Sequence, residues 1–596
     1  LALTCATEAG ATTDKQPKLK GRQTAAWGVA VPGSRTQSAS AMRFLNMGLG
    51  APMAAPRAVG NDPVSSVTTP GFGWADGPDG NQWYYTQNYK LDGYFYSGST
   101  ITLYDNNNQQ VGQFDIDVPD TLQVNSIEMY SALTKKMFDR DDTSIEAMVS
   151  IHAVGNAENN YKDCYITRAY HIDGSGIAYE CEGSGMLFDA SKGWNTYQRL
   201  ILPIEKVIDG KEYVSIDFIA PPTWGKDEPY VEHTLDIPFD NINYMDGAYI
   251  NCFVIEDKPY YVVAQYDTAY CTMPEDYTQD IIVTPNNHFV LKTYDRNYSL
   301  VDSVAVPIEE SPKGIYRMAA FGRMSDNDLS KGYFGPEDQF SYVVTWVDYH
   351  LQSDENTYNF DLYDNQAQRL KTICENAAEN QWFYLNNVKG KSEQMAFLQA
   401  LEEGQQIQMV DVPSCEKRTL FPAMIDGEGI TTSIDRYPSA KNDEGYQYVV
   451  NMRNAAEDEE GNVIARIGWY NPDLTLDHYA KFNLGKKGEY FTPLINNVSL
   501  NPYLFDTDNE MEYIYIAKKR RTDGTNKIDN ILEIAKEDGT ILRTFRGDDA
   551  KSFRTASVVN MSDAKNELLV AYYNNNTQDY DLNFYELPFV KFAKGG

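Results

Sequence analysis

The sequence predicts an all-β protein, and more narrowly a β-propeller of seven or eight blades that follows a flexible N-terminal tether. From about residue 75 onward, short runs of Val, Ile, Tyr and Phe alternate with clusters of Asn, Asp, Gly and Pro. One kind of apolar strand also recurs at intervals of tens of residues, which is typical of folds built from repeated sheets. A pair of tandem β-sandwich domains is the alternative fold.

Composition excludes several classes of protein. The chain has 596 residues, a formal net charge of −34 and 42% hydrophobic residues, so it can bury a large core. No run approaches the roughly 18 apolar residues that a membrane-spanning helix needs. The strongly acidic surface would repel phosphate backbones, so we expect no nucleic-acid partner.

The first five residues, Leu1-Ala2-Leu3-Thr4-Cys5, read like the end of a secretory signal and resemble a bacterial lipoprotein processing site. Cys5 would then carry a lipid anchor. A free thiol near the end of the chain is the alternative interpretation.

Residues 6–70 are dominated by Ala, Gly, Thr, Ser and Pro and show no sustained period, which predicts a flexible tether before a propeller over 71–596. Residues 1–62 contain seven basic and three acidic side chains, a net charge of +4, so the remainder carries −38. A basic tail on an acidic body favours docking on anionic lipid or on a partner.

The recurrent apolar strand contains aliphatic and tyrosine side chains in succession. Its expected copies begin at Ile145, Glu212, Pro259, Phe340, Tyr446, Met511 and Glu567, with a further strand at Met395. A second kind of strand runs into an Asp, Asn or Gly turn, where positive φ angles are tolerated. It occurs at 101–105, 290–295, 359–364, 467–471 and 531–539.

Two longer echoes support repetition: residues 138–146 resemble 505–512, and residues 81–85 resemble 380–384. We expect the final strand, 582–587, to complete a sheet with N-terminal strands. The best candidate for a helix is 392–403.

Six cysteines follow Cys5, and an even number in an exported chain suggests disulfides. Sequential pairing would join Cys164 to Cys181 across a hairpin with an Asp-Gly turn, Cys252 to Cys271, and Cys374 to Cys415. Buried free thiols are the alternative.

The lipoprotein-like cysteine, the Tyr- and Asn-rich body, the repeated Phe-Asp-x-Asp-Asp/Asn segment and the Glu-Asp-Gly-Thr turn at 537–540 resemble large exported surface lipoproteins of Bacteroidota. In that group a short Asp-Ser/Thr-aliphatic motif signals O-glycosylation, and residues 120–122, 267–269 and 302–304 fit it. The resemblance implies a lipid-anchored outer-membrane protein at the cell surface, with the periplasmic face as an alternative. It also implies work beside an integral barrel or transporter and other lipoproteins.

Catalytic motifs are missing from the sequence. There is no His-Glu-x-x-His, Cys-x-x-Cys, Gly-x-Ser-x-Gly or Walker-type loop, and the six histidines never fall at ligand spacing. We therefore expect no enzyme activity and no cofactor, except for a structural Ca²⁺ as a hypothesis. Its candidate ligands are Asp139, Asp141 and Asp142, or Asp506 and Asp508.

Aromatic side chains are the other candidates for a site. Trp346, Tyr349, Trp469 and Tyr470 could present flat faces to sugar rings, whereas Trp83 and Trp382 are expected in the core. The leading functional hypothesis is a non-enzymatic surface lipoprotein that acts as an interaction scaffold in an outer-membrane complex. A glycan-binding lipoprotein is the alternative, and a propeller-type glycan or peptide hydrolase or lyase comes third.

Overall fold

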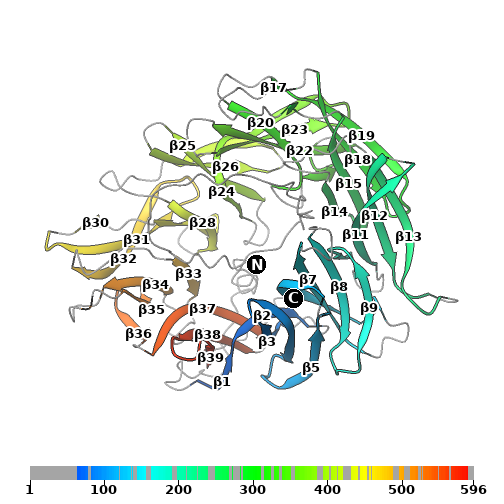
Figure 1. Ribbon diagram of the computed structural model, residues 1–596. Helices are drawn as coiled ribbons and strands as arrows, with labels where there is room; N and C mark the ends of the chain where they lie inside the picture. Colours follow the sequence, from blue (N-terminus) through cyan, green and yellow to red (C-terminus); the bar gives the residue numbers. More distant parts are fainter. Residues whose placement is uncertain are drawn as a thin grey trace.

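The protein is built from β-strands arranged in a ring. The computed structural model describes residues 63–587 with interruptions, the longest at 239–248, 273–281, 421–430, 487–495 and 502–510. All regular elements in these described segments are strands, and no helix there is long and apolar enough to cross a membrane. Figure 1 shows the sheets radiating around a common centre, as the blades of a β-propeller do. The all-β prediction is confirmed.

Grouped in chain order, the strands of the described residues form nine four-stranded antiparallel units, although strand pairing joins units one and two, and units five and six, into two eight-stranded sheets. The expected number of seven or eight is therefore not confirmed. Unit one contains β2 (Gly71–Asp76), β3 (Gln82–Asp92), β4 (Phe95–Tyr104) and β5 (Gln110–Asp117), and unit two contains β6 (Gln123–Thr134), β7 (Glu146–Val154), β8 (Cys164–His171) and β9 (Ile177–Glu182). Unit three contains β10 (Met186–Asp189), β11 (Gln198–Ile208), β12 (Lys211–Ala220) and β13 (Tyr230–Pro238), and unit four contains β14 (Tyr249–Ile255), β15 (Lys258–Tyr266), β18 (His288–Asp295) and β19 (Leu300–Pro307).

Units five and six share one long strand, β24 (Arg369–Leu385), which pairs with β23 near its start and with β25 near its end. Unit five also contains β20 (Ile315–Ala320), β22 (Phe340–His350) and β23 (Asn356–Asp364), and unit six also contains β25 (Gln394–Leu401), β26 (Gly404–Asp411) and β27 (Glu416–Leu420). Unit seven contains β28 (Thr431–Pro438), β29 (Tyr446–Met452), β31 (Asn462–Tyr470) and β32 (Leu476–Lys486), and unit eight contains β33 (Asn496–Asn501), β34 (Glu512–Arg520), β35 (Ile528–Lys536) and β36 (Ile541–Arg546). Short additional strands are β16 (Cys271–Thr272), β17 (Ile282–Val283), β21 (Leu329–Lys331) and β30 (Ala456–Glu457).

The ninth unit joins the two ends of the described chain. It contains β37 (Lys551–Ser562), β38 (Lys565–Asn574) and β39 (Tyr580–Glu586), and its fourth strand is β1 (Ser65–Thr69). β1 pairs with β39 over five residue pairs, from Ser65 opposite Phe584 to Thr69 opposite Tyr580. Figure 1 shows blue β1 beside red β39. The predicted completion of a sheet by the final strand is confirmed, and the last residues assigned to the tether belong to the fold.

The predicted recurrent strands occupy equivalent places in the ring. Seven of the eight are second strands of their units, and the exception, at Glu212, lies in the third strand β12. The second strands of the first and third units, β3 and β11, were not among the predicted copies.

The second kind of strand is the third strand of its unit, and the turn that follows has a repeated geometry. In the turn after β4, the Asn108 amide donates to the Asp105 carbonyl and the Asp105 amide donates to the Gln109 carbonyl. The same pair of bonds recurs in the turns that start at Asp295, Asp364, Asn471 and Lys536. The fourth residue of each turn has positive φ, and it is Asn108, Tyr298, Ala367, Leu474 and Gly539 respectively.

We expect Ala367→Gly to raise stability and Gly539→Ala to lower it. Ala367 has a φ of 60°, where a side chain costs about 1 kcal/mol relative to glycine. Gly539 has a φ of 86°, and an added Cβ would also lie 2.6 Å from the Lys481 carbonyl oxygen. Thermal unfolding of both variants measures the two shifts, and shifts of the same sign would contradict this account of the turns.

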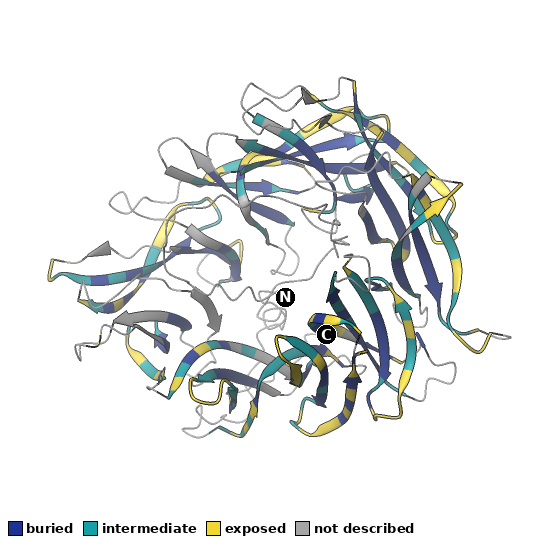
Figure 2. Cartoon of the chain, in the orientation of Figure 1, coloured by how far each residue is buried: buried dark blue, intermediate teal, exposed yellow. Residues whose placement is uncertain are grey.

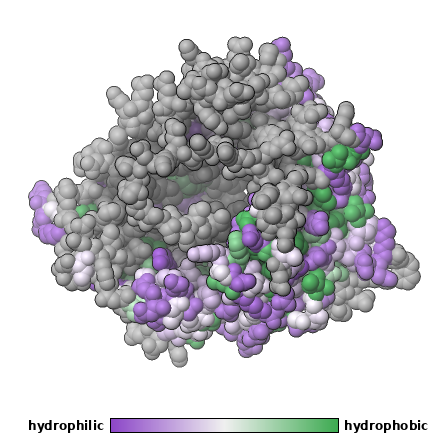
Figure 3. Space-filling model, in the orientation of Figure 1, coloured by the Kyte–Doolittle hydropathy of each residue, from purple (hydrophilic) through white to green (hydrophobic). Residues whose placement is uncertain are grey.

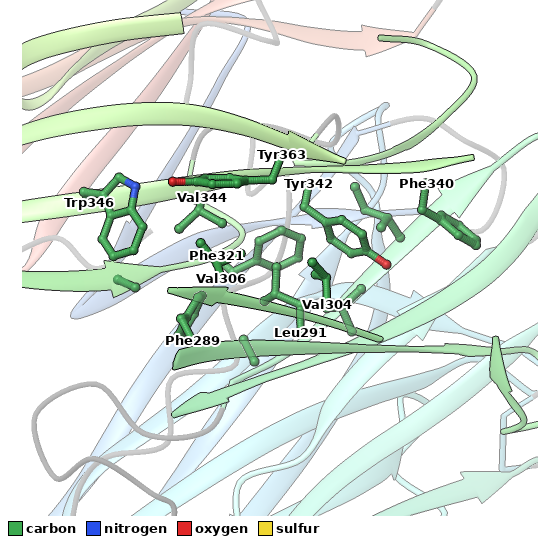
Figure 4. Packing of buried hydrophobic residues seen from close by; sticks show 14 of the residues in the cluster. Phe289, Leu291, Val304, Val306, Phe321, Phe340, Tyr342, Val344, Trp346 and Tyr363 are labelled. Atoms are coloured by element: carbon green, nitrogen blue, oxygen red, sulfur yellow. The ribbon is translucent and has the colours of Figure 1, made fainter. Parts of the chain in front are cut away.

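Neighbouring units pack face to face, and most second strands are buried on both faces (Figure 2). A tyrosine that faces the preceding unit recurs on these strands as Tyr84, Tyr261, Tyr342, Tyr448 and Tyr513. The Tyr342 hydroxyl, for example, donates to Asp302 of unit four at 2.8 Å. Figure 4 shows Tyr342 among the aromatic and aliphatic side chains that join units four and five.

The candidate helix at 392–403 was wrong, because residues 394–401 form strand β25. Met395 and Phe397 pack toward unit five, whereas Ala396 and Leu398 pack toward unit seven. A strand buried on both faces is apolar throughout and loses the period of two that would distinguish it from a helix.

Candidate functional site

The predicted calcium ligands Asp139, Asp141, Asp142, Asp506 and Asp508 all lie outside the described residues, as does the predicted lipidation site, Cys5. Within the segments that the structure does describe, no group of three or more His, Cys, Asp or Glu side chains could hold a metal ion.

The predicted stacking residues lie in the core, so this prediction needs correction. Trp346, Trp469 and Tyr470 are only 3%, 4% and 3% exposed. Trp346 packs between units four and five, and the Trp469 indole donates to the Tyr513 hydroxyl at 2.9 Å. Tyr349 is half-buried against the clusters on both sides of its strand. The expected core positions of Trp83 and Trp382 are confirmed, since both pack against inter-unit clusters.

The predicted disulfides are not formed by the cysteines whose side chains are described. Cys164, Cys181, Cys252, Cys374 and Cys415 are all free, and the side chain of Cys271 lies outside the described part. On the β8–β9 hairpin, Cys181 stands opposite Thr167. Cys164 is three residues away from Thr167, and an odd offset places the two thiols on opposite faces of the sheet. Cys374 and Cys415 share a core cluster, but their thiols do not bond to each other. The Cys374 thiol donates to the Glu375 carbonyl, and the Cys415 thiol donates to the Val412 carbonyl.

We expect these thiols to react slowly in the native protein. Burial raises the pKa of Cys181 and of Cys374 to about 12, and it also raises that of Cys252. A raised pKa lowers the thiolate fraction at pH 8, so alkylation should be at least about 100-fold slower than in urea. Peptide mapping after timed iodoacetamide treatment measures each site. Rapid native labelling of Cys374, or a linked Cys164–Cys181 peptide, would contradict this expectation.

One cluster has the residue types of a serine hydrolase. The Ser144 hydroxyl donates to Glu146 at 2.8 Å and lies 3.0 Å from His171 Nδ1. In a catalytic triad the serine and the carboxylate contact different nitrogens of the histidine. Here both approach Nδ1, since Glu146 is 3.8 Å from the same atom. The histidine therefore does not lie between the serine and the carboxylate as it does in a catalytic triad. We interpret the cluster as a structural hydrogen-bond network at the start of β7.

The most exposed aromatic feature of the described surface is the hairpin between β3 and β4. Asp92 pairs with Phe95, so Gly93 and Tyr94 form a two-residue turn, and Gly93 has the positive φ of 64° that a Gly-x hairpin turn requires. Tyr94 at its tip is 98% exposed, and Leu91 is 64% exposed. We call Tyr89, Leu91, Tyr94 and Tyr96 the hairpin platform.

The base of the platform is held rigidly. The Tyr89 and Tyr96 rings lie 4.9 Å apart, and the Tyr89 hydroxyl donates to Gln87 Oε1 at 3.3 Å. The buried Gln87 amide in turn donates to the Ile127 carbonyl on β6 at 3.0 Å. Tyr96 also pairs with Val124 of β6. These contacts join the first hairpin to the second unit, so the aromatic side chains are presented from a fixed base.

Burial, with a contribution from the neighbouring carboxylate Glu128, raises the pKa of Tyr85 and Tyr89 to about 12. Both hydroxyls therefore remain protonated, and able to donate hydrogen bonds, to a higher pH than a free tyrosine does. Lys90 on the same hairpin is paired with Asp115 and Asp117, at 3.2 and 3.8 Å. The rim of the platform is consequently acidic, with Asp92 and Glu128 exposed.

The sequence did not predict this platform, because the aromatic candidates were tryptophans and tyrosines of the apolar strands. The available signal was Gly93 between Leu91-Asp92 and the aromatic residues 94–96, which indicates a Gly-x hairpin turn with aromatic side chains at its tip. In Figure 3 most of the described surface on the visible side is hydrophilic, with separate hydrophobic spots.

No protein-family model matches this sequence, and no curated protein matches it. Among solved structures, the chain is similar to an acylaminoacyl peptidase, with 8% identity and a TM-score of 0.26 over 74% of this chain and 57% of that one. It thus spans a little over half of that peptidase. It is also similar to extracellular domains 1–2 of Drosophila Semaphorin 1b, with 7% identity and a TM-score of 0.25 over 90% and 88%. Polysaccharide lyase Uly1 matches with 8% identity and a TM-score of 0.23 over 90% and 92%.

Proposed function

We propose that the protein is a non-enzymatic interaction scaffold, an outer-membrane surface lipoprotein whose hairpin platform binds a protein partner. The observation that carries the proposal is the exposure of Tyr94 and Leu91 at the tip of a hairpin whose base is fixed. Exposed aromatic side chains on a rigid element contribute strongly to protein interfaces because little entropy is lost on binding.

The chemistry of the platform defines the partner. Its centre is apolar and aromatic, and its rim carries Asp92 and Glu128. A complementary surface would present an apolar pocket with basic side chains around it. An integral outer-membrane barrel or transporter with such a periplasmic or surface loop is the proposed partner class.

The proposal is tested by capturing partners from detergent-solubilised native outer membrane with wild-type and variant protein. Leu91→Ser with Tyr94→Ser should reduce recovery of the partner at least about 100-fold, as expected for loss of two central contacts. Val207→Ser is the matched control, because Val207 is 71% exposed on another hairpin strand, β11. Equal recovery by wild type and the double variant would contradict the proposal.

Glycan binding is the second candidate, favoured by the fully exposed Tyr94 ring, since sugar rings stack on flat aromatic faces. The two functions respond differently to Leu91→Ser. Stacking on Tyr94 should survive this change, whereas a protein interface should weaken. Glycan-array retention that depends on Tyr94 but not on Leu91 would favour the glycan.

A further inference from the structure

A cavity of about 380 Å³ lies between the seventh and eighth units, away from the hairpin platform. It is lined by Ile464 and Arg466 of β31, Lys481 and Asn483 of β32, and the turn Asp538–Gly539 between β35 and β36.

Strand register explains why these side chains converge. Arg466 pairs with Lys481, and Ile464 pairs with Asn483, so all four side chains share one face of the β31–β32 hairpin. The turn of the eighth unit approaches closely because residue 539 is glycine, whose position leaves no room for a Cβ beside the Lys481 carbonyl.

The cavity contains two cationic side chains, Arg466 and Lys481. Arg466 Nε is buried and has no hydrogen-bond acceptor among the described residues, although its guanidinium lies over the Tyr479 ring at 5.9 Å. Lys481 is exposed and pairs directly across the strands from Arg466. Like charges directly opposite each other destabilise a sheet. A bound anion would reduce this repulsion and would also accept a hydrogen bond from Arg466 Nε.

The third charge limits the kind of anion. Asp538 Oδ1 accepts a hydrogen bond from the Thr540 amide at 2.8 Å. This bond and one from the Thr540 side chain keep the pKa of Asp538 below its usual value. Two cations and one carboxylate sum to +1, which matches a monoanion. The carboxylate can also accept hydroxyl groups, and Ile464 offers an apolar contact.

We propose that this cavity binds an acidic sugar, with Arg466 and Lys481 holding its carboxylate and Asp538 accepting hydrogen bonds from its hydroxyls. The site is independent of the hairpin platform and concerns a small ligand rather than a protein.

The test is saturation-transfer NMR and calorimetric titration of the full chain with glucuronate, glucose, acetate and sulfate. Glucuronate should bind saturably, with little binding of glucose or acetate. Arg466→Gln and Lys481→Gln should each weaken glucuronate at least about tenfold, as expected for loss of a charge-assisted hydrogen bond. Lys486→Gln, on the same strand but outside the cavity lining, should not change it.

The remaining outcomes overturn the proposal. Absence of saturable glucuronate binding at concentrations up to about 50 mM, well above a millimolar dissociation constant, would exclude the site. Equal binding by wild type and both cavity variants would place the ligand elsewhere. If acetate bound as strongly as glucuronate, the proposed recognition of a sugar would be rejected. If sulfate bound more tightly than glucuronate, the proposed preference for a monoanion would be rejected. Lys481 is exposed, so Lys481→Gln keeps the test valid if Arg466→Gln does not fold.

Discussion

Deleting residues 1–69 should lower the unfolding free energy by about 3–5 kcal/mol, because it removes β1 and opens the ring. The estimate follows from about 1 kcal/mol for each backbone hydrogen bond of a five-residue strand. Side-chain bonds add to it: Ser66 donates to Asn583 at 2.7 Å, and Thr68 donates to Asp581 at 2.6 Å. Lys551 pairs with the same carboxylate at 2.7 Å. The deletion also exposes the edge of β39, which favours aggregation.

Deletion of residues 1–62 is the matched control, since it removes the predicted anchor and most of the tether but keeps β1. Denaturant titration of the three proteins compares their midpoints. We expect the shorter deletion to match wild type and the longer one to unfold earlier. Equal midpoints for both deletions would show that β1 does not close the ring.

Replacing Trp346 or Trp469 with Ala should destabilise the fold by about 3–5 kcal/mol, as large-to-small changes in a packed core do. Trp469→Ala would also leave the Tyr513 hydroxyl without its indole donor. Tyr94→Ala, by contrast, should change stability by no more than about 0.5 kcal/mol because Tyr94 contacts solvent.

Thermal and denaturant unfolding of the three variants measures these differences. The pattern separates a core role from a ligand-stacking role, because a stacking residue would lose binding and keep stability. A stable Trp346→Ala protein would return this residue to the list of binding candidates.

The sequence predicted the strand class, the recurrence and the joining of the chain ends because these depend on local pattern and turn chemistry. The predicted number of seven or eight units is not confirmed, and two features of the sequence make the units hard to count. β3 is rich in Tyr, Gln and Asn instead of aliphatic residues, so it did not match its counterparts. β24 serves two units, so no turn marks the boundary between them.

The site was harder to predict because exposure depends on neighbouring units. Trp346 and Tyr94 are both aromatic residues in β-rich segments, yet one is enclosed by the preceding unit and the other extends beyond its sheet. The predicted Cys164–Cys181 disulfide depended on strand register in the same way. Cys181 pairs with Thr167, three residues from Cys164, so the two thiols lie on opposite faces of the sheet. The cavity at Arg466 depends on a turn contributed by the next unit, about 70 residues later in the sequence.

The most direct test of the proposed function is site-specific photocrosslinking in the native cell envelope. A photoreactive phenylalanine analogue is placed at position 94, and at position 207 as a solvent-exposed control. The hairpin platform predicts a discrete crosslinked protein from position 94 that is absent from position 207 and is lost when Leu91 is changed to Ser. No crosslink from position 94, or the same products from both positions, would contradict the interaction scaffold.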